Sequence, residues 1–154
     1  MDASQMVRGH DLFRSLPPRE VDAVSSLAAV KRFAKGEVIH HRGHPASHLF
    51  VLLKGRVEQQ LGAAGAESGM SVGRAEPGDL VGIASLLGAE RYTTTARCAE
   101  PCELLVLEAA PLLEVLRRNP EADRGVLAAV ARSYFTRYEA LLGRRQAILV
   151  QVSG

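Results

Sequence analysis

Short apolar segments separated by glycine and proline fill the middle of the chain and predict a β-rich body. The predicted strands are Val30–Phe33, Val38–His40, His48–Lys54, Arg56–Leu61, Met70–Arg74, Thr93–Cys98 and Cys102–Leu107. Lys35-Gly36 and Lys54-Gly55 mark tight turns between them, because glycine accepts a positive φ that other residues avoid. Gly62–Gly69 is rich in glycine and alanine and predicts a hairpin loop. Closely spaced short strands of this kind are typical of a sandwich, barrel or roll.

Helical patterns flank this body on both sides. Apolar residues of Val7–Leu16, and of the segment from Glu20 to Leu27 after Pro17-Pro18, recur at helical spacing and predict two short helices within about residues 1–29. The β-roll then covers about residues 30–108. Ala110–Leu116 predicts another short helix, which ends near Asn119-Pro120, and a long helix is predicted over about residues 121–150.

The apolar residues of this long helix fall on two neighbouring stripes. One stripe contains Leu127, Val130, Tyr134, Leu141 and Ile148, and the other contains Ala128, Ala131, Phe135, Tyr138 and Leu142. A helix that packs on one surface needs a single stripe. The second stripe therefore predicts a partner, and we expect a homodimer in which the first stripe makes a coiled-coil-like contact. The alternative is a helix deeply buried in its own monomer.

Composition places the chain among ordinary globular proteins. It has 154 residues, 47% apolar and 23% charged, with a net charge of +2, so its charge does not favour binding to nucleic acid. The two cysteines, Cys98 and Cys102, are too few for an extracellular disulfide scaffold. No apolar stretch reaches membrane-spanning length. We therefore expect a cytoplasmic protein without a membrane partner.

The stretch Gly78–Ala96 has the outline of a phosphate cradle. A strand end flanked by Gly78 and Gly82 leads into the apolar turn Ile83–Leu87, and a polar loop with three threonines follows. A short helix that opens at Gly82 would present free N–H groups, which suit an anion. The segment is thus the candidate ligand site.

With these elements in this order, the chain resembles the cyclic-nucleotide-binding domain of CRP/FNR-type regulators. The run Phe33–Val57, with its glycine turns, is similar to the first hairpins of that family, and Pro77–Gly82 is similar to the approach to its phosphate cassette. Cys102-Glu103-Leu104 resembles the strand after the cassette, and Arg117–Pro120 resembles the entry to the dimerisation helix. The resemblance implies a mainly β fold with helices, a double-stranded β-helix (jelly-roll) that carries the cassette over 78–96.

The resemblance also implies a role in transcription regulation rather than catalysis. In the family, a hinge and a helix-turn-helix domain that binds DNA follow the long helix. Gln151–Gly154 resembles that hinge, so we expect a DNA-binding domain after residue 154 of a longer protein. The chain would then be the effector-sensing, dimerising part, and it would contact DNA only through that further domain. A stand-alone sensor, or one fused to another output, is the alternative.

Two positions of the cassette depart from the pattern of cyclic-nucleotide binders. Ile83 stands where a glutamate is expected to accept the ribose hydroxyl, and Tyr92 stands where an arginine is expected to grip the phosphate. Arg91 lies one residue earlier, and Thr93 keeps a hydroxyl for the phosphate. The resemblance places effector contacts at Gly82, Ile83, Ala84, Arg91, Tyr92, Thr93, Thr94, Arg137 and Tyr138. We expect an altered or different effector in place of conventionally bound cAMP, or a pocket without a ligand.

Histidines and cysteines provide the other candidate chemistry. His40, His41, His44 and His48 lie within nine residues, and a haem-based gas sensor on this fold would need such axial ligands. The simpler interpretation is that they are surface histidines of a β-turn. Cys98 and Cys102 could form a thiol switch, but strand cysteines more often pack as small apolar residues. The sequence contains no catalytic motif and no recognisable metal site.

Overall fold

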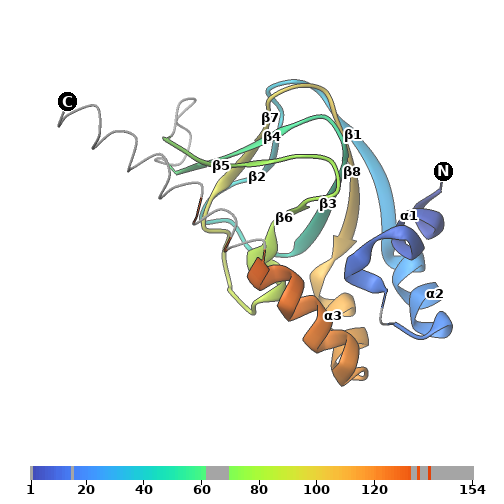
Figure 1. The fold of residues 1–154 in the computed structure, drawn as a ribbon. Helices are drawn as coiled ribbons and strands as arrows, with labels where there is room; N and C mark the ends of the chain where they lie inside the picture. Colours follow the sequence, from blue (N-terminus) through green and yellow to red (C-terminus); the bar gives the residue numbers. More distant parts are fainter. Residues whose placement is uncertain (1, 15, 62–69, 133–134, 136–138, 140–154) are drawn as a thin grey trace.

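The computed structural model describes residues 2–14, 16–61, 70–132, 135 and 139. Within these residues the chain forms two four-stranded antiparallel sheets that close into a roll, as the sequence predicted (Figure 1). One sheet has the order β1-β8-β3-β6 and the other β2-β7-β4-β5. The strands are β1 (Ala28–Phe33), β2 (Val38–His40), β3 (His48–Lys54), β4 (Val57–Leu61), β5 (Met70–Ala75), β6 (Leu80–Val81), β7 (Thr95–Cys98) and β8 (Cys102–Glu108).

Strands β3 and β8 are buried on both faces. Successive side chains of a strand point to opposite sides of its sheet. In β3, Leu49 and Val51 contact the core on the helical side, whereas Phe50 and Leu52 contact the core between the two sheets. Residues of β8 divide between the same two cores in the same alternation. This two-sided burial explains why both strands are nearly continuous apolar runs in the sequence.

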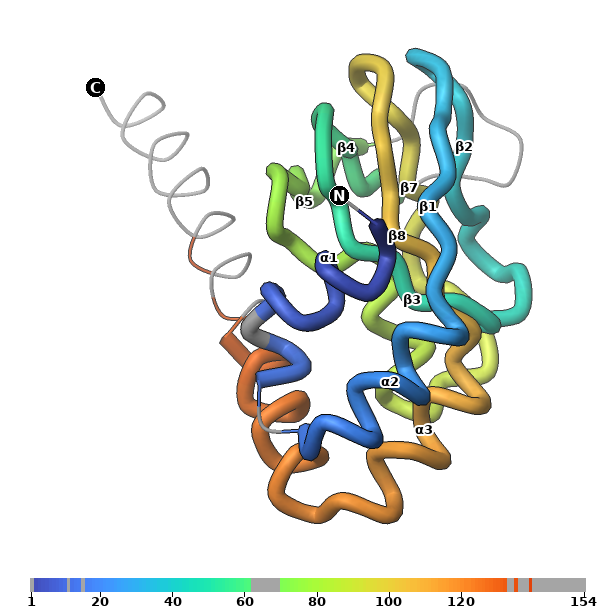
Figure 2. Tube along the Cα trace, turned by 90° about the vertical axis from the view of Figure 1, so that its right-hand side faces the viewer, coloured from blue at the N-terminus to red at the C-terminus, as the bar shows by residue number. Residues whose placement is uncertain are grey.

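The helices α1 (Ala3–Gly9), α2 (Pro18–Leu27) and α3 (Ala109–Arg117) lie together at one end of the roll (Figures 1 and 2). Helix α1 begins with a capping box, in which the Asp2 side chain accepts from the Gln5 backbone N–H and the Gln5 side chain accepts from the Asp2 backbone N–H. Helix α2 begins with Pro18 at its first position, where the missing N–H removes no hydrogen bond.

The first helix differs from its prediction. The apolar spacing placed it over Val7–Leu16, but α1 ends at Gly9 and a separate 3-10 turn, η1 (Asp11–Phe13), follows. The capping box fixes an earlier start than the apolar pattern indicated. Val7, Leu12, Phe13 and Leu16 nevertheless all pack into the helical-side core.

A junction of polar contacts joins α2 to the end of α3. The Arg118 guanidinium donates to the Glu20 carboxylate at 3.3 Å, and Asn119 donates through its side chain to the Val115 carbonyl oxygen at 2.7 Å. Hydrogen bonding by Asn119 and Arg118 lowers the pKa of Glu20. The next helical segment, described over residues 120–132, starts directly after this junction. None of the described helices is both long enough and apolar enough to cross a membrane.

Candidate functional site

The cassette begins where β6 ends, at a glycine that no other residue could replace without strain. Gly82 has a φ of +79°, and a Cβ atom built on it would lie 3.0 Å from the His48 carbonyl oxygen. The four-residue 3-10 turn η2 (Ile83–Leu86) follows at once. The Ser85 hydroxyl donates to the Gly82 carbonyl oxygen at 2.8 Å, so it closes the turn and serves a structural role.

The side chains of η2 point into the protein. Ile83 is 3% exposed and belongs to the helical-side core, and Ala84 is also buried. The sequence placed Ile83 opposite a ribose, and the structure instead places it among apolar side chains. An isoleucine gains about 2 kcal/mol from such burial, which a ribose-binding carboxylate at the same place could not obtain.

Tyr92 fills the space beside Gly82. It is 6% exposed, and its ring stacks on His40 with centroids 4.0 Å apart. A Cβ atom on Gly82 would lie 3.3 Å from this ring. The Tyr92 hydroxyl accepts from the His48 backbone N–H at 3.0 Å and donates to the His48 carbonyl oxygen at 2.7 Å. Burial raises the pKa of this hydroxyl, which therefore stays neutral and can serve as the donor.

The remaining cassette residues are used in contacts with neighbouring segments. The Arg91 guanidinium donates to the Gly43 carbonyl oxygen at 2.6 Å, so it lies against the turn after β2. The Thr94 hydroxyl donates to the Gln59 side chain at 2.7 Å. Thr93 is exposed. In this structure, therefore, the hydrogen bond of the Arg91 side chain is with the turn after β2.

Residues 41–47, which we call the histidine turn, pair with the end of the cassette. The Gly43 N–H donates to the Tyr92 carbonyl oxygen at 2.9 Å, and the Tyr92 N–H donates to the His44 carbonyl oxygen at 3.0 Å. The Ala46 N–H donates to the Glu90 carbonyl oxygen, also at 3.0 Å. The two loops therefore form one unit, although about 45 residues separate them in the sequence.

This unit surrounds a cavity of about 300 Å³. Its lining residues come from β2, the histidine turn, β3 and the cassette: Ile39, His40, His41, His44, Pro45, Ser47, His48, Phe50 and Tyr92. A neighbouring hollow of about 540 Å³ shares Pro45, Ser47 and His48 and extends to Glu90 and to Leu113 of α3. The smaller cavity is at the lower limit of the size range for small-molecule sites.

The sequence did not predict that these histidines would meet around a cavity. It treated the cluster as surface histidines of a turn, which fits the exposed His41 and His44. It does not fit His40, which is buried between Tyr92 and Phe50 with ring centroids 4.0 and 6.2 Å away. No local signal marked this difference, because β2 has only three residues and its register shifts between Val38 and His40. The described residues contain no cluster of ligands that could hold a metal ion.

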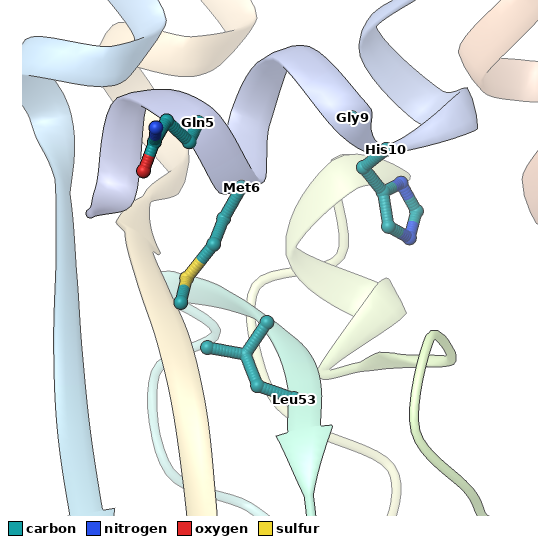
Figure 3. A pocket seen from close by; sticks show the side chains of 5 residues that line it. All are labelled: Gln5, Met6, Gly9, His10 and Leu53. Carbon is teal, nitrogen blue, oxygen red and sulfur yellow. The ribbon is translucent and has the colours of Figure 1, made fainter. Parts of the chain in front are cut away.

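A wider cavity of about 620 Å³ lies between α1 and β3 (Figure 3). Met6 reaches down from α1 toward Leu53, while the His10 ring points to the turn before the cassette. The Leu12 N–H donates to His10 Nδ1 at 3.1 Å, and the other ring nitrogen bonds the Gly78 carbonyl oxygen at 2.8 Å. His10 thus ties α1 to the cassette approach and has no ring nitrogen left for a ligand.

Cys98 is the last residue of β7 and Cys102 is the first residue of β8, and both cysteines are free and buried. The Cys102 thiol contacts the carbonyl oxygens of Glu100 and Arg56 at 3.2 and 3.4 Å. Burial, together with the neighbouring Cys102, raises the pKa of Cys98 to about 12. A thiol of this kind forms almost no thiolate at neutral pH and is a poor nucleophile.

The described part of the terminal helix divides its apolar residues between two faces. Val130 is 2% exposed and packs into the core of its own chain with Ala122 and Val126, whereas Leu127 is 45% exposed and Phe135 60% exposed. Val130 and Leu127, predicted on one dimer stripe, therefore face different surroundings. The other predicted members of that stripe, and the base-contacting Arg137 and Tyr138, lie outside the described residues.

Comparison with known proteins identifies the domain. A family model described as the cyclic nucleotide-binding domain matches residues 30–119, more than half of the chain. The chain therefore belongs to the cyclic nucleotide-binding domain family. Its elements follow the β-roll, cassette and helix order on which the sequence resemblance was based.

Relatives show two settings for such a domain. The cyclic AMP receptor protein of Thermus thermophilus is 29% identical over 126 residues, which cover 82% of this chain and 58% of that protein. A Rhodopseudomonas palustris protein named as a potassium channel protein is 27% identical over 121 residues, 79% of this chain and 29% of that protein. The chain thus spans little more than half of one relative and less than a third of the other.

A solved structure of similar extent supports the fold. The sensor domain of the transcriptional regulator DNR from Pseudomonas aeruginosa superposes with a TM-score of 0.72. It is 19% identical, and the match covers 84% of this chain and 91% of that one.

Proposed function

We propose that this chain is the effector-sensing, dimerising regulatory module of a CRP-type transcription regulator whose effector is not a conventionally bound cyclic nucleotide. The observation that carries the proposal is the position of Tyr92. Its ring takes the space beside Gly82, and its hydroxyl is engaged by both backbone groups of His48. A phosphate at this place would meet an aromatic ring where the family is expected to offer a guanidinium.

The other cassette contacts support the same conclusion. A ribose hydroxyl needs an acceptor, and Ile83 offers none because it is apolar and core-facing. An unpaired hydroxyl costs about 1–3 kcal/mol. Arg91 donates through one of its nitrogens to the Gly43 carbonyl oxygen, so its guanidinium lies at the turn after β2. A cyclic nucleotide would thus lack both the carboxylate expected to bind its ribose and the guanidinium expected to bind its phosphate.

The exposed apolar residues of the terminal helix support dimerisation. Leu127, Ala128, Ala131 and Phe135 are all exposed, while Ala122, Val126 and Val130 already pack on the chain's own core. A helix with a second apolar face beside its buried face suits a parallel helix pair between two copies. Signal output would then pass from the cassette through α3 and this helix to a DNA-binding domain in the longer protein.

Two alternatives are less well supported. A haem needs a large apolar slot and an axial ligand. Imidazoles line the cavity and could serve as ligands, but its volume of about 300 Å³ is small for such a slot. A thiol switch needs a reactive thiolate, and burial has the opposite effect on Cys98. A ligand-free scaffold stays as the outcome if no effector is found.

Calorimetric titration with cAMP and cGMP, together with light scattering, tests the proposal. We expect no saturable binding of either nucleotide and a dimeric mass. The variant Phe135→Glu should lower the mass toward that of a monomer, whereas Arg74→Glu, an exposed change on β5, should leave it unchanged. Micromolar binding of cAMP, or a monomer at high concentration, would refute the corresponding half of the proposal.

A further inference from the structure

We propose that the cavity enclosed by the histidine turn binds a small aromatic carboxylate. This inference rests on the proposed sensor function and specifies the chemistry of its effector. The site shares Tyr92 with the cassette contacts expected for a cyclic nucleotide, but its imidazoles come from β2, the histidine turn and the start of β3. The proposed site would therefore use the same loops of the fold without the phosphate contacts that the family is expected to make.

The polar groups of the cavity suit an anion. Three of its imidazoles, those of His41, His44 and His48, are exposed or half-buried, and the rings of His41 and His44 have centroids only 4.8 Å apart. Among the described residues that line it, none is an aspartate or a glutamate. Imidazole N–H groups donate to carboxylate oxygens, and two adjacent donors match the two oxygens of one carboxylate.

Hydrogen bonding holds the third imidazole in place. The Ser47 hydroxyl and His48 Nδ1 lie 2.8 Å apart, which fixes the ring next to the opening of the cavity. The Arg91 guanidinium lies against the Gly43 carbonyl oxygen on the same turn and adds positive charge nearby. On the neighbouring strand, Glu108 pairs in register with His48 but lies outside the lining of this cavity. Glu90 and Glu108 line the neighbouring hollow, whereas the lining of this cavity offers imidazole donors to a negative ligand.

The remaining wall is apolar and partly aromatic. Ile39, Pro45, Phe50 and Tyr92 supply it, and Phe50 and Tyr92 both belong to the ring cluster around His40. A flat apolar body would lie against these side chains while its carboxylate met the imidazoles. At about 300 Å³ the cavity accommodates a single ring with a short substituent.

Occupancy of this cavity can reach the terminal helix through hydrogen bonds that the structure already contains. The Ala109 N–H, at the first position of α3, donates to the Ser47 carbonyl oxygen at 2.9 Å. On the other side, the turn pairs with Glu90 and Tyr92 of the cassette. A ligand that stiffened the turn would therefore act on both the cassette and α3, which leads to the 120–132 helix.

Isothermal titration with benzoate, benzamide and inorganic phosphate, on the whole chain near neutral pH, tests the inference. We expect saturable binding of benzoate, and weaker binding of benzamide by about tenfold or more, because the amide has the same shape without the charge. The variants His41→Gln and His44→Gln should each weaken benzoate binding by about tenfold. The control variant His10→Gln removes an imidazole outside the cavity, and it should change the affinity for benzoate by less than about twofold.

Several results would overturn the inference. These are the absence of saturable benzoate binding, equal binding of benzamide, phosphate binding as tight as benzoate, or unchanged affinity in both His41→Gln and His44→Gln. Because those two side chains are exposed, loss of the fold does not confound the test, and circular dichroism confirms this. If neither benzoate nor cAMP binds and the chain is dimeric, the proposed sensor function stands without this ligand. Binding of cAMP would instead refute the part of that proposal that excludes a conventionally bound cyclic nucleotide.

Discussion

Removing the Tyr92 hydroxyl tests whether its two hydrogen bonds to the His48 backbone stabilise the cassette. The variant Tyr92→Phe keeps the ring, and hence the stacking on His40, but it removes the group that accepts from the His48 N–H and donates to the His48 carbonyl oxygen. These two backbone groups then lose their partner in a part-buried place. Each such loss costs about 1 kcal/mol, so we expect a total destabilisation of about 2 kcal/mol.

Urea denaturation followed by circular dichroism measures this loss in the free energy of unfolding, and thermal denaturation gives the matching shift in melting temperature. For a chain of this length, a loss of about 2 kcal/mol lowers the melting temperature by about 4–8 °C. The matched control is Ser26→Ala, since the Ser26 hydroxyl also donates to a backbone carbonyl oxygen, at 2.7 Å, but lies exposed on α2. The control should change stability by less than about 0.5 kcal/mol. If the Tyr92→Phe variant is as stable as that control, the Tyr92 hydroxyl does not stabilise the cassette.

Two further changes test the frame around the site. Gly55→Ala should destabilise the protein by about 2–3 kcal/mol, because Gly55 has a φ of +97° and the new Cβ would lie 2.5 Å from the Pro101 carbonyl oxygen. The control Gly36→Ala, with a φ of +85° and open space around the new Cβ, should lower the free energy of unfolding by only about 1 kcal/mol in the same denaturation assay. Equal losses would contradict the steric argument. Glu20→Gln should lower stability at neutral pH, because the pKa of Glu20 is lowered by Asn119 and Arg118. This contribution is present above the ordinary value of 4.5 and is lost as the pH falls through the lowered pKa, so the gap between the two proteins should close in acid. If the difference in stability between the two proteins is the same at every pH, the ionised Glu20 carboxylate does not stabilise the fold through Arg118 and Asn119.

The strands were the most predictable part of the fold. β2 and β3 begin and end at the predicted residues because glycine and proline turns bound them on both sides. β7 starts two residues later than predicted: Thr93 and Thr94 have strand-like composition, but the cassette end pairs with the histidine turn before the sheet begins. β1 starts two residues earlier, since the alternation through Ala28 and Ala29 was too weak to separate it from α2.

The site was less predictable because its contacts are distant in sequence. The substitutions at Ile83 and Tyr92 were visible as departures from the family pattern, but what each side chain does was not. Whether Tyr92 fills its own cassette depends on His40 and His48, more than 40 residues away, and no local pattern encodes that packing. The sequence assigned Val130 to the dimer stripe, but the structure packs it into the chain's own core. Two adjacent apolar stripes do not reveal which one meets that core.

The core-facing Ile83 and the backbone-bonded Tyr92 together constrain which substitutions the cassette can accept. Exchanging Ile83 alone for glutamate would bury a carboxylate among apolar side chains without a partner. Exchanging Tyr92 alone for arginine would abandon both backbone groups of His48 and remove the ring that fills the space beside Gly82. Each single exchange is therefore expected to destabilise the domain. A redesign of this cassette toward the nucleotide contacts expected in the family has to change both positions together.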